Sequence, residues 1–264
     1  MEFSKEVMDA FRLSGDTVAL EGGQNTSVRI ENAVVKPVGD ARHTEWLLNR
    51  IHELNPVGYR VSKPIRSTSG TFVYQGWACT RYEAGQHANG LLAEKLLVSK
   101  LFHRDLCPLS LRDFPHTDNP WSRSHRIAWQ VDELPEKMPK EMQEAIRPLL
   151  QRVSLQETYT VQVVHGDLAG NILFDERLSP LIIDFSPTVA PVEYAEAILA
   201  CDCIAWQGCK VAELDLLPPT ALYNEMIARA VIFRVTVAAF LSNGDYSKFV
   251  REYNAFKPIM ESIQ

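Results

Sequence analysis

Two linked stretches decide the fold: Val163-Val164-His165-Gly166-Asp167-Leu168-Ala169-Gly170-Asn171-Ile172-Leu173-Phe174, followed closely by Leu181-Ile182-Ile183-Asp184-Phe185. Their short apolar runs predict three strands, joined by a polar loop over 165–171 and a turn over 175–180. Asp167, Asn171 and Asp184 fall at strand ends, so we expect one small hairpin to bring them together. Phosphoryl transfer from a nucleotide needs such a set. One carboxylate orients the acceptor hydroxyl, while an amide oxygen and a second carboxylate hold Mg²⁺.

The pattern His-Gly-Asp-Leu-x-x-Asn-Ile-Leu-Phe with a downstream Ile-Ile-Asp-Phe resembles the aminoglycoside phosphotransferase-like branch of the protein-kinase-like fold. Choline kinases and homoserine kinases are relatives within that fold. The resemblance implies that Asp167 is the catalytic aspartate, that Asn171 and Asp184 bind Mg²⁺, and that His165 braces the loop. It also implies ATP as cofactor and a two-lobed α+β architecture, with a β-rich N-terminal lobe over 1–84 and a mainly helical, catalytic and acceptor-binding C-terminal lobe over 85–264.

The loop departs from the family pattern at one point. Three residues, Leu168-Ala169-Gly170, separate the aspartate from the asparagine where the family usually has four. The loss of one residue shifts Asn171 by up to ~3.5 Å along the chain, unless Gly170 allows a tighter turn. The departure leaves a second hypothesis open, a nucleotide-binding protein of the same fold that has little or no transfer activity and a regulatory role.

The N-terminal region supplies candidates for nucleotide binding. Apolar stretches at 28–30 and 33–38 predict strands, and Asp40 is a suitable N-cap for a helix on which Leu47, Ile51 and Leu54 share one face. Lys36 lies within an apolar run, where pairing with phosphates would explain a cation. Glu45 on the following helix is the expected partner of Lys36, and Glu53 is the competing candidate. The expected phosphate-covering loop contributes Gly22, Gly23, Asn25, Thr26 and Ser27, although a plain hairpin turn fits the two glycines equally well.

A linker that receives the adenine is expected after the strand at 76–80. The resemblance places it near Arg81, Tyr82 and Glu83, where backbone groups would bond the base. Gly85 ends this segment, and helical patterns dominate the chain from about residue 88 onward.

The acceptor is expected to be a small molecule that carries a hydroxyl group. Only about eight residues separate Asp184 from a predicted helix near Glu193, which is too short a segment for the peptide-docking platform of a protein kinase. By the resemblance, the acceptor wall would draw on residues near that helix and elsewhere: Glu193, Tyr194, Glu196, Asp202, Trp206, Trp121 and His125. The acidic members would favour a cationic acceptor such as an aminoglycoside. The alternative is that Glu193 and Glu196 only complement the helix dipole.

Composition excludes several classes of protein. The 264 residues are 46% hydrophobic and 23% charged, as in globular domains, and the net charge of −6 offers no general attraction to nucleic acid or acidic lipid. The apolar stretch 231–241 is interrupted by Arg234 and is too short to cross a membrane. No secretory signal is visible at the N-terminus, and five cysteines are an odd number, so we expect reduced thiols and a cytoplasmic protein. Cys201 and Cys203 are expected in a helix core, because residues two apart point away from each other and cannot easily share a metal.

Overall fold

The computed structural model describes residues 4–20, 27–153 and 159–263, which fold into two compact units. The first unit comprises Met1–Gln86, Arg112–His116 and Leu173–Asp184, and the second comprises His87–Leu111, Thr117–Ile172 and Phe185–Gln264. The sequence prediction divided the chain once, between residues 84 and 85. It therefore assigned 112–116 and 173–184 to the C-terminal lobe.

The first unit is built on a five-stranded antiparallel sheet with the strand order β1-β2-β3-β6-β5. Strands β5 and β6 join through a tight turn, in which Gln75 and Gly76 both take positive φ, as a two-residue hairpin requires. In the register of β3 and β6, Val35 lies opposite Cys79 and Lys36 lies opposite Ala78. The strands are β1 (Thr17–Ala19), β2 (Val28–Ile30), β3 (Ala33–Pro37), β5 (Val73–Tyr74) and β6 (Trp77–Arg81).

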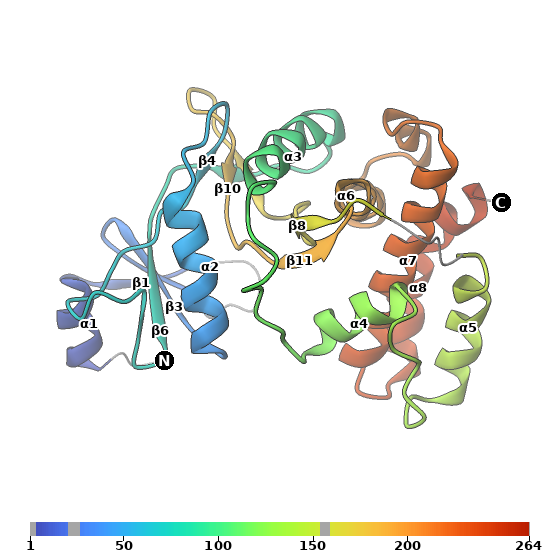
Figure 1. Cartoon of the computed structure of the whole chain (residues 1–264), viewed down its shortest axis with the longest axis horizontal. Helices are drawn as coiled ribbons and strands as arrows, with labels where there is room; N and C mark the ends of the chain where they lie inside the picture. The colour runs from blue at the N-terminus through green and yellow to red at the C-terminus, as the bar shows by residue number, and fades with distance from the viewer. Residues whose placement is uncertain (1–3, 21–26, 154–158, 264) are drawn as a thin grey trace. The chain divides into compact units, whose positions relative to one another are not determined.

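Helices α1 (Lys5–Phe11) and α2 (Ala41–Glu53) accompany this sheet (Figure 1). Val35 and Cys79 are buried with residues of α1, whereas Ala78 packs with Leu48 of α2 and with Phe72. Successive residues of a strand point to opposite faces of the sheet. Lys36, opposite Ala78, therefore lies on the face that carries α2, and the apolar alternation of β3 explains its position.

A second, four-stranded sheet has the order β4-β10-β9-β7. Strand β10 pairs in parallel with β4, so Leu181 lies opposite Arg60 and Ile182 opposite Val61. This pairing fixes the strand that precedes Asp184 to the first unit. The strands are β4 (Arg60–Val61), β7 (Gln86–His87), β9 (Ile172–Phe174) and β10 (Leu181–Ile182).

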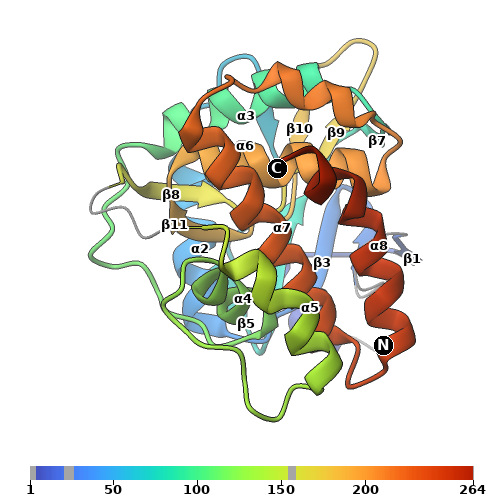
Figure 2. The same ribbon diagram turned by 90° about the vertical axis from the view of Figure 1, so that its right-hand side faces the viewer.

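The second unit is mainly helical, and its central element is α7 (Ala221–Leu241). This helix packs against α4, α5, α6 and α8 (Figure 2). Because α7 is covered on several sides, it is buried over nearly its whole second half, in keeping with its continuous apolar sequence. The other helices are α3 (Leu92–Leu106), α4 (Pro120–Ala128), α5 (Lys140–Leu150), α6 (Val192–Trp206), α8 (Tyr246–Ser262) and the short 3₁₀ helix η1 (Val211–Leu216).

The predicted hairpin of three consecutive strands is wrong. Strand β8 (Gln162–His165) pairs with β11 (Pro187–Ala190) in a separate two-stranded ribbon, and does not join β9 and β10 in their sheet. Strand β8 also packs against α3 and α6, which bury its apolar residues. The segment after Asp184, expected to be only a connection to the next helix, supplies the partner strand.

Helix α6 carries the predicted cysteine core. Cys201 and Cys203 are both fully buried in it, as expected for small core residues. Among the described residues, no group of three or more His, Cys, Asp or Glu side chains could hold a metal ion by itself. Within the same ranges, no helix has both the length and the apolar character needed to cross a membrane.

Candidate functional site

In the first unit, Lys36 and Asp184 form an ion pair between Nζ and Oδ1, although 148 residues separate them in the sequence. Strand β3 positions the lysine, and Asp184 follows β10 with a φ of 45°, a left-handed conformation that Asp tolerates better than most residues. The Lys36 side chain is 35% exposed and the Asp184 side chain is 50% exposed. Both remain accessible to a ligand.

Glu45 does not pair with Lys36 among the described residues, so this part of the prediction is wrong. Its carboxylate accepts hydrogen bonds from the backbone N–H groups of Phe72, at 2.9 and 3.1 Å, and of Val73, at 2.8 Å. The backbone donors at the start of β5 thus satisfy the acid instead. Glu53, the competing candidate, forms an ion pair with Arg50 at 2.8 Å.

The predicted phosphate-covering loop lies mostly outside the described residues, as Gly22, Gly23, Asn25 and Thr26 belong to the segment 21–26. Ser27 is described at the start of β2. Its carbonyl accepts the backbone N–H of Leu20 at 3.1 Å, which closes the hairpin between β1 and β2.

At the predicted adenine linker, the backbone groups of Arg81 and Tyr82 bond within the protein. The Arg81 N–H donates to the carbonyl of Lys63 and the Tyr82 N–H donates to that of Asn32, each at 2.8 Å. The Arg81 carbonyl accepts the Ser62 hydroxyl at 2.6 Å. These three groups therefore have hydrogen-bond partners within the protein, and their contact with the base stays a prediction.

The predicted linker ends at Gly85. A Cβ atom added to this glycine would lie 2.8 Å from Cβ of Leu173 in β9. Such an approach excludes any larger residue unless the backbone shifts. Sequence reasoning recognised Gly85 only as a break in a strand pattern.

In the second unit, two consecutive hydrogen bonds hold the backbone at Asp167 in place. The Asp167 N–H donates to Nδ1 of His165, and the His165 N–H donates to Nε2 of His103, both at 3.0 Å. His165 and His103 are almost completely buried. The bracing role of His165 thus has a geometric basis, and His103, which the sequence did not single out, extends it.

The shortened loop closes as a compact turn. The Asn171 N–H donates to the Leu168 carbonyl at 2.9 Å, and Asn171 Nδ2 donates to the Asp167 carbonyl at 2.6 Å. Between them, the carbonyl of Ala169 accepts a hydrogen bond at 3.0 Å from Nζ of Lys95, a fully buried cation on α3. Hydrogen bonds within the loop and from Lys95 therefore hold the shortened loop in a closed turn.

Of the two glycines in this loop, Gly166 is the constrained one. A Cβ at Gly166 would lie 3.0 Å from Nε2 of His125, whose ring stacks on Phe233. Gly170 lies outside the left-handed region, and a Cβ there would meet no described atom within 4 Å. The expectation that Gly170 allows the tighter turn is therefore wrong, because ordinary backbone angles suffice.

Arg234, on α7, binds the Asp167 carboxylate. Its Nη2 lies 2.6 Å from Asp167 Oδ1, and its Nε donates at 2.8 Å to Oδ1 of Asp202, which also bonds Nη2 through Oδ2. Burial by itself would raise the pKa of Asp167, but the charge and hydrogen bond of Arg234 outweigh it, so this pKa lies below its usual value. Burial raises the pKa of Asp202 to about 6, with Arg234 opposing the shift.

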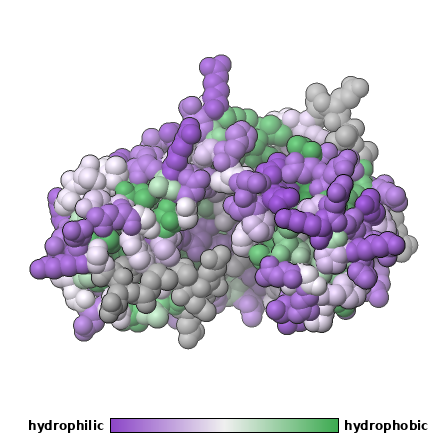
Figure 3. Space-filling view, turned by 90° about the horizontal axis from the view of Figure 1, so that it is seen from below, coloured by the Kyte–Doolittle hydropathy of each residue, from purple (hydrophilic) through white to green (hydrophobic). Residues whose placement is uncertain are grey.

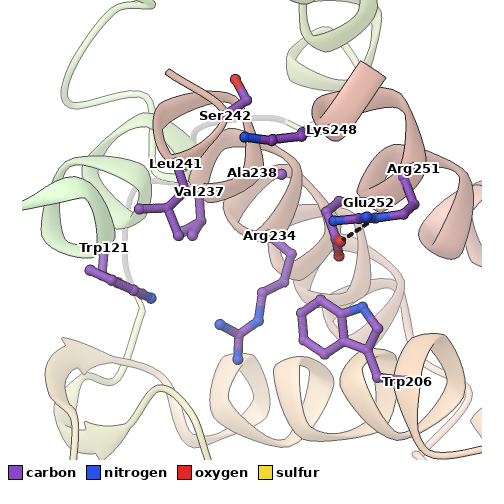
Figure 4. A pocket seen from close by; sticks show the side chains of 10 residues that line it. All are labelled: Trp121, Trp206, Arg234, Val237, Ala238, Leu241, Ser242, Lys248, Arg251 and Glu252. Atoms are coloured by element: carbon purple, nitrogen blue, oxygen red, sulfur yellow. Dashed lines mark hydrogen bonds and ion pairs between the residues drawn. The ribbon is translucent and has the colours of Figure 1, made fainter. Parts of the chain in front are cut away.

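Arg234 also lines a pocket of about 330 Å³ within the second unit (Figure 4). Two of the residues predicted to form the acceptor wall, Trp121 and Trp206, line it too. The acidic residues of the predicted acceptor wall, Glu193, Glu196 and Asp202, do not line this pocket. Glu196 is buried and accepts the Tyr223 hydroxyl at 2.6 Å, and Asp202 is buried against Arg234.

Two further residues of the predicted acceptor wall, Tyr194 and His125, contact each other. The Tyr194 hydroxyl lies 3.0 Å from Nδ1 of His125. Tyr194 is completely buried. Burial, reinforced by the Arg234 charge, lowers the pKa of His125 to about 3, so this side chain is neutral at physiological pH.

The sequence matches no protein-family model and no curated protein. Its structure is similar to a thermostable mutant of aminoglycoside phosphotransferase APH(4)-Ia in the apo form, with a TM-score of 0.63 at 13% identity over 98% of both chains. Choline kinase LicA from Streptococcus pneumoniae gives a TM-score of 0.62 at 13% identity, over 98% of this chain and 96% of the other.

A third similar structure is spectinomycin phosphotransferase APH(9)-Ia, solved with ADP and spectinomycin, with a TM-score of 0.55 at 14% identity over 92% of this chain and 88% of that one. These similarities span almost the whole chain. At sequence identities this low, they establish the fold alone. The chain therefore has the α+β protein-kinase-like fold, with a β-rich N-terminal lobe and a mainly helical C-terminal lobe, which confirms the fold predicted from residues 163–185.

Proposed function

We propose that this protein is an ATP-dependent phosphotransferase that moves the γ-phosphoryl group to a hydroxyl group of a small molecule. The observation that carries the proposal is the Asp167 carboxylate. It is held by Arg234 through Oδ1, braced through its own N–H by His165, and still 41% exposed at its side chain. Within the described ranges, its second oxygen, Oδ2, has only a long 3.4 Å contact from Asn171 Nδ2, which leaves it available to an acceptor hydroxyl.

The nucleotide would be held by residues of the first unit. Lys36 would contact the phosphates, with Ser27 and the predicted loop residues covering them. Similar structures support nucleotide binding by this fold, since they include complexes with ADP, AMP and GDP. The roles of Glu45, Arg81 and Tyr82 in this binding remain predictions.

Mg²⁺ fits the chemistry of the residues proposed to hold it. Asp184 offers a carboxylate and Asn171 an amide oxygen, which are the hard oxygen ligands that this cation prefers. When bound, Mg²⁺ supplies positive charge that offsets the charge on the transferred phosphoryl group.

In the proposed transfer, Asp167 accepts the proton of the acceptor hydroxyl. The acceptor O–H bond breaks and its proton passes to Asp167 Oδ2 as the new O–P bond forms. The bond from the γ-phosphorus to the bridging oxygen breaks, and its electron pair leaves with ADP. Because Arg234 keeps the pKa of Asp167 low, the carboxylate stays ionised at neutral pH and mainly orients the hydroxyl.

The alternative function is nucleotide binding without efficient transfer. The shortened loop and the engagement of Asp167 by Arg234 favour it, because an aspartate tied to a cation is a weaker base. The local hydrogen bonds around Asn171 and Ala169 favour the enzyme, because they keep the loop closed despite the missing residue.

A single assay separates the two functions. With ATP and Mg²⁺, ADP formation is measured alone and with a panel of alcohols and aminoglycosides. Asp167→Asn is expected to lower turnover by ~10²–10⁴-fold, the usual contribution of a positioned proton acceptor, with nucleotide affinity nearly unchanged. Asp215→Asn, at an exposed position in η1, is the matched control with the same change of charge.

Equal turnover of Asp167→Asn and the wild type would contradict the proposed role of Asp167 in transfer. Tight ATP binding with no turnover on any alcohol would contradict the enzyme and favour the binding protein.

A further inference from the structure

We propose that the pocket beside Arg234 binds the acceptor, and that this acceptor is an uncharged alcohol with a single ring that stacks on the indole of Trp206. This inference rests on the proposed function and names its class of substrate. The residues that line the pocket all belong to the second unit. Its volume of about 330 Å³ lies at the lower end of the range of ligand pockets, which suits a molecule with one ring.

The charged side chains that line the pocket already have partners within the protein. They form the ion pairs Arg234 with Asp167 and Asp202, Lys248 with Asp245, and Arg251 with Glu252. Among the described residues that line the pocket, Glu252 is the only acid, so a cationic ligand would meet three cations and one carboxylate. An anionic ligand would compete with the carboxylates that hold those cations. Neither sign of charge is therefore favoured, and the pocket suits an uncharged molecule.

Apolar side chains make up the rest of the lining. The one serine is engaged within the protein, since the Ser242 hydroxyl donates to the Ala239 carbonyl at 2.8 Å and is almost completely buried. The remaining residues are Trp121, Trp206, Val237, Ala238 and Leu241. On the face seen from below in Figure 3, by contrast, apolar side chains form small separate patches in a mainly hydrophilic surface. Apolar and aromatic contact is therefore what the pocket offers a ligand.

Trp206 offers a flat surface that is held in place. It is the last residue of α6 and is 49% exposed, and Phe256 of α8 contacts it edge-to-face with the ring centres 5.1 Å apart. A ring with an apolar face can stack on the exposed part of this indole, which removes apolar surface from water. A ring is already rigid, whereas an open chain of similar size loses conformational freedom when it lies along the indole. The geometry therefore favours a cyclic alcohol over an open-chain one.

Arg234 connects the pocket to Asp167. Its guanidinium carbon lies 5.4 Å from the centre of the Trp206 ring, and its Nη2 lies 2.6 Å from Oδ1 of Asp167. In Figure 4 the guanidinium extends toward the space between the indoles of Trp121 and Trp206, where the ring of the acceptor would lie. A ligand stacked on Trp206 is therefore one side chain away from the carboxylate that is proposed to orient its hydroxyl.

The test compares rings with open chains of similar size. Glucose is paired with sorbitol and cyclohexanol with 1-hexanol, so that one pair carries a sugar ring and the other an apolar ring. Binding is measured by NMR titration and transfer by ADP formation. We expect at least one ring to bind about tenfold more tightly than its open-chain counterpart, because one face of the ring is buried on an indole. Since ion pairs do not carry this preference, it should persist at high salt.

Two variants of Trp206 test whether the indole is responsible. Trp206→Leu keeps an apolar side chain without a flat face and should lose the preference for the ring, whereas Trp206→Phe should keep part of it. The matched control is Tyr246→Leu, which removes an aromatic side chain of similar exposure, 47%, outside the pocket. It should keep the full preference. Glucosamine and glucuronate, which add a positive or a negative charge to the glucose ring, should bind no more tightly than the better neutral ring.

The inference is overturned if no ring binds, if the open chains bind as tightly as the rings, or if a charged ring binds more tightly than the neutral ones. It is also overturned if Trp206→Leu, shown to be folded by urea denaturation, behaves like Tyr246→Leu. The comparison of rings with open chains uses the wild-type protein, so it decides the question even where a variant does not fold.

These outcomes are distinguishable from failure of the proposed function. Transfer to cyclic and open-chain alcohols alike that depends on Asp167, unchanged in Trp206→Leu, would leave the phosphotransferase intact and remove the selection of a ring. Ring binding that Trp206→Leu abolishes, with no transfer to any alcohol, would keep the ring-binding pocket and remove the enzyme.

Discussion

Asp184 in the first unit is proposed to hold Mg²⁺ and Asp167 in the second to orient the acceptor hydroxyl, but the protein holds these two carboxylates in opposite ways. Asp184 pairs with Lys36 near the surface, where both side chains are at least one-third exposed. Asp167 belongs to a loop fixed by buried partners, including His165, Lys95 and Arg234. A bound ligand can therefore rearrange the Lys36–Asp184 pair, whereas the Asp167 loop is held in one conformation by its buried partners.

This difference has an energetic consequence. An exposed ion pair contributes about 0–1 kcal/mol to stability because water screens it, whereas the loss of one partner from a buried pair leaves an uncompensated charge. Substitutions of the buried partners of Asp167 should therefore reduce both stability and activity, and those at the Lys36–Asp184 pair should reduce activity alone.

The largest effect on stability is expected from Arg234→Met. The Asp202 side chain is 1% exposed, and without Arg234 its charge has lost its main partner. We expect the free energy of unfolding to fall by about 3–5 kcal/mol, measured by urea denaturation. The double variant Arg234→Met, Asp202→Leu should recover much of this loss, since it removes the buried charge as well.

Arg251→Met, at a highly exposed position on α8, is the control and should change stability by no more than about 0.5 kcal/mol. Equal losses for Arg234→Met and Arg251→Met would show that the buried pairs at Arg234 do not stabilise the loop.

The second prediction concerns His103 and the response of the loop to acid. Burial, with a smaller effect of His165, lowers the pKa of His103 from 6.5 to about 3. Its Nε2 accepts the His165 N–H and its Nδ1 contacts the Ser99 hydroxyl at 3.1 Å, so protonation would disrupt the brace of Asp167. Between pH 6.5 and 3 the unfolded chain binds a proton that the folded chain does not, so stability rises with pH through this window.

We therefore expect acidification below pH 6.5 to cost up to about 1.4 kcal/mol per pH unit from this residue. Denaturation of His103→Asn should show a shallower pH dependence than the wild type, while His116→Gln, at an exposed position, should match the wild type. In the wild type, the NMR signals of the His103 ring should remain those of a neutral imidazole down to pH 4; protonation near pH 6 would contradict the prediction.

Much of the fold could be predicted because its signals are local. The strands at 28–30 and 33–38 and the helix after Asp40 follow from apolar periodicity and an N-cap, and the structure confirms them to within one residue. The pairing of β8 with β11 could not be predicted, because the sequence of a short apolar strand does not specify its partner. Neighbours in sequence were assumed to be neighbours in the sheet.

The site residues divide in the same way. Asp167 and His165 belong to a dense local motif, and their hydrogen bond spans two residues. Arg234 was visible only as a charge that interrupts an apolar stretch, and its partners lie 67 and 32 residues away. A buried cation in such a helix signals a buried acid, but the sequence does not say which acid.

The smallest effect on stability is expected from Lys36→Met, and it isolates the first unit. Because the ion pair with Asp184 is exposed, the free energy of unfolding should change by about 1 kcal/mol or less. A charged hydrogen bond to phosphate is worth ~1.5–3 kcal/mol, so nucleotide affinity, measured by calorimetry, should fall by roughly 10–100-fold. Lys5→Met, at an exposed position on α1, controls for the loss of a charge. A large loss of stability with unchanged nucleotide binding would assign Lys36 to the folding of the first unit, and the contrast with the Asp167 loop would no longer hold.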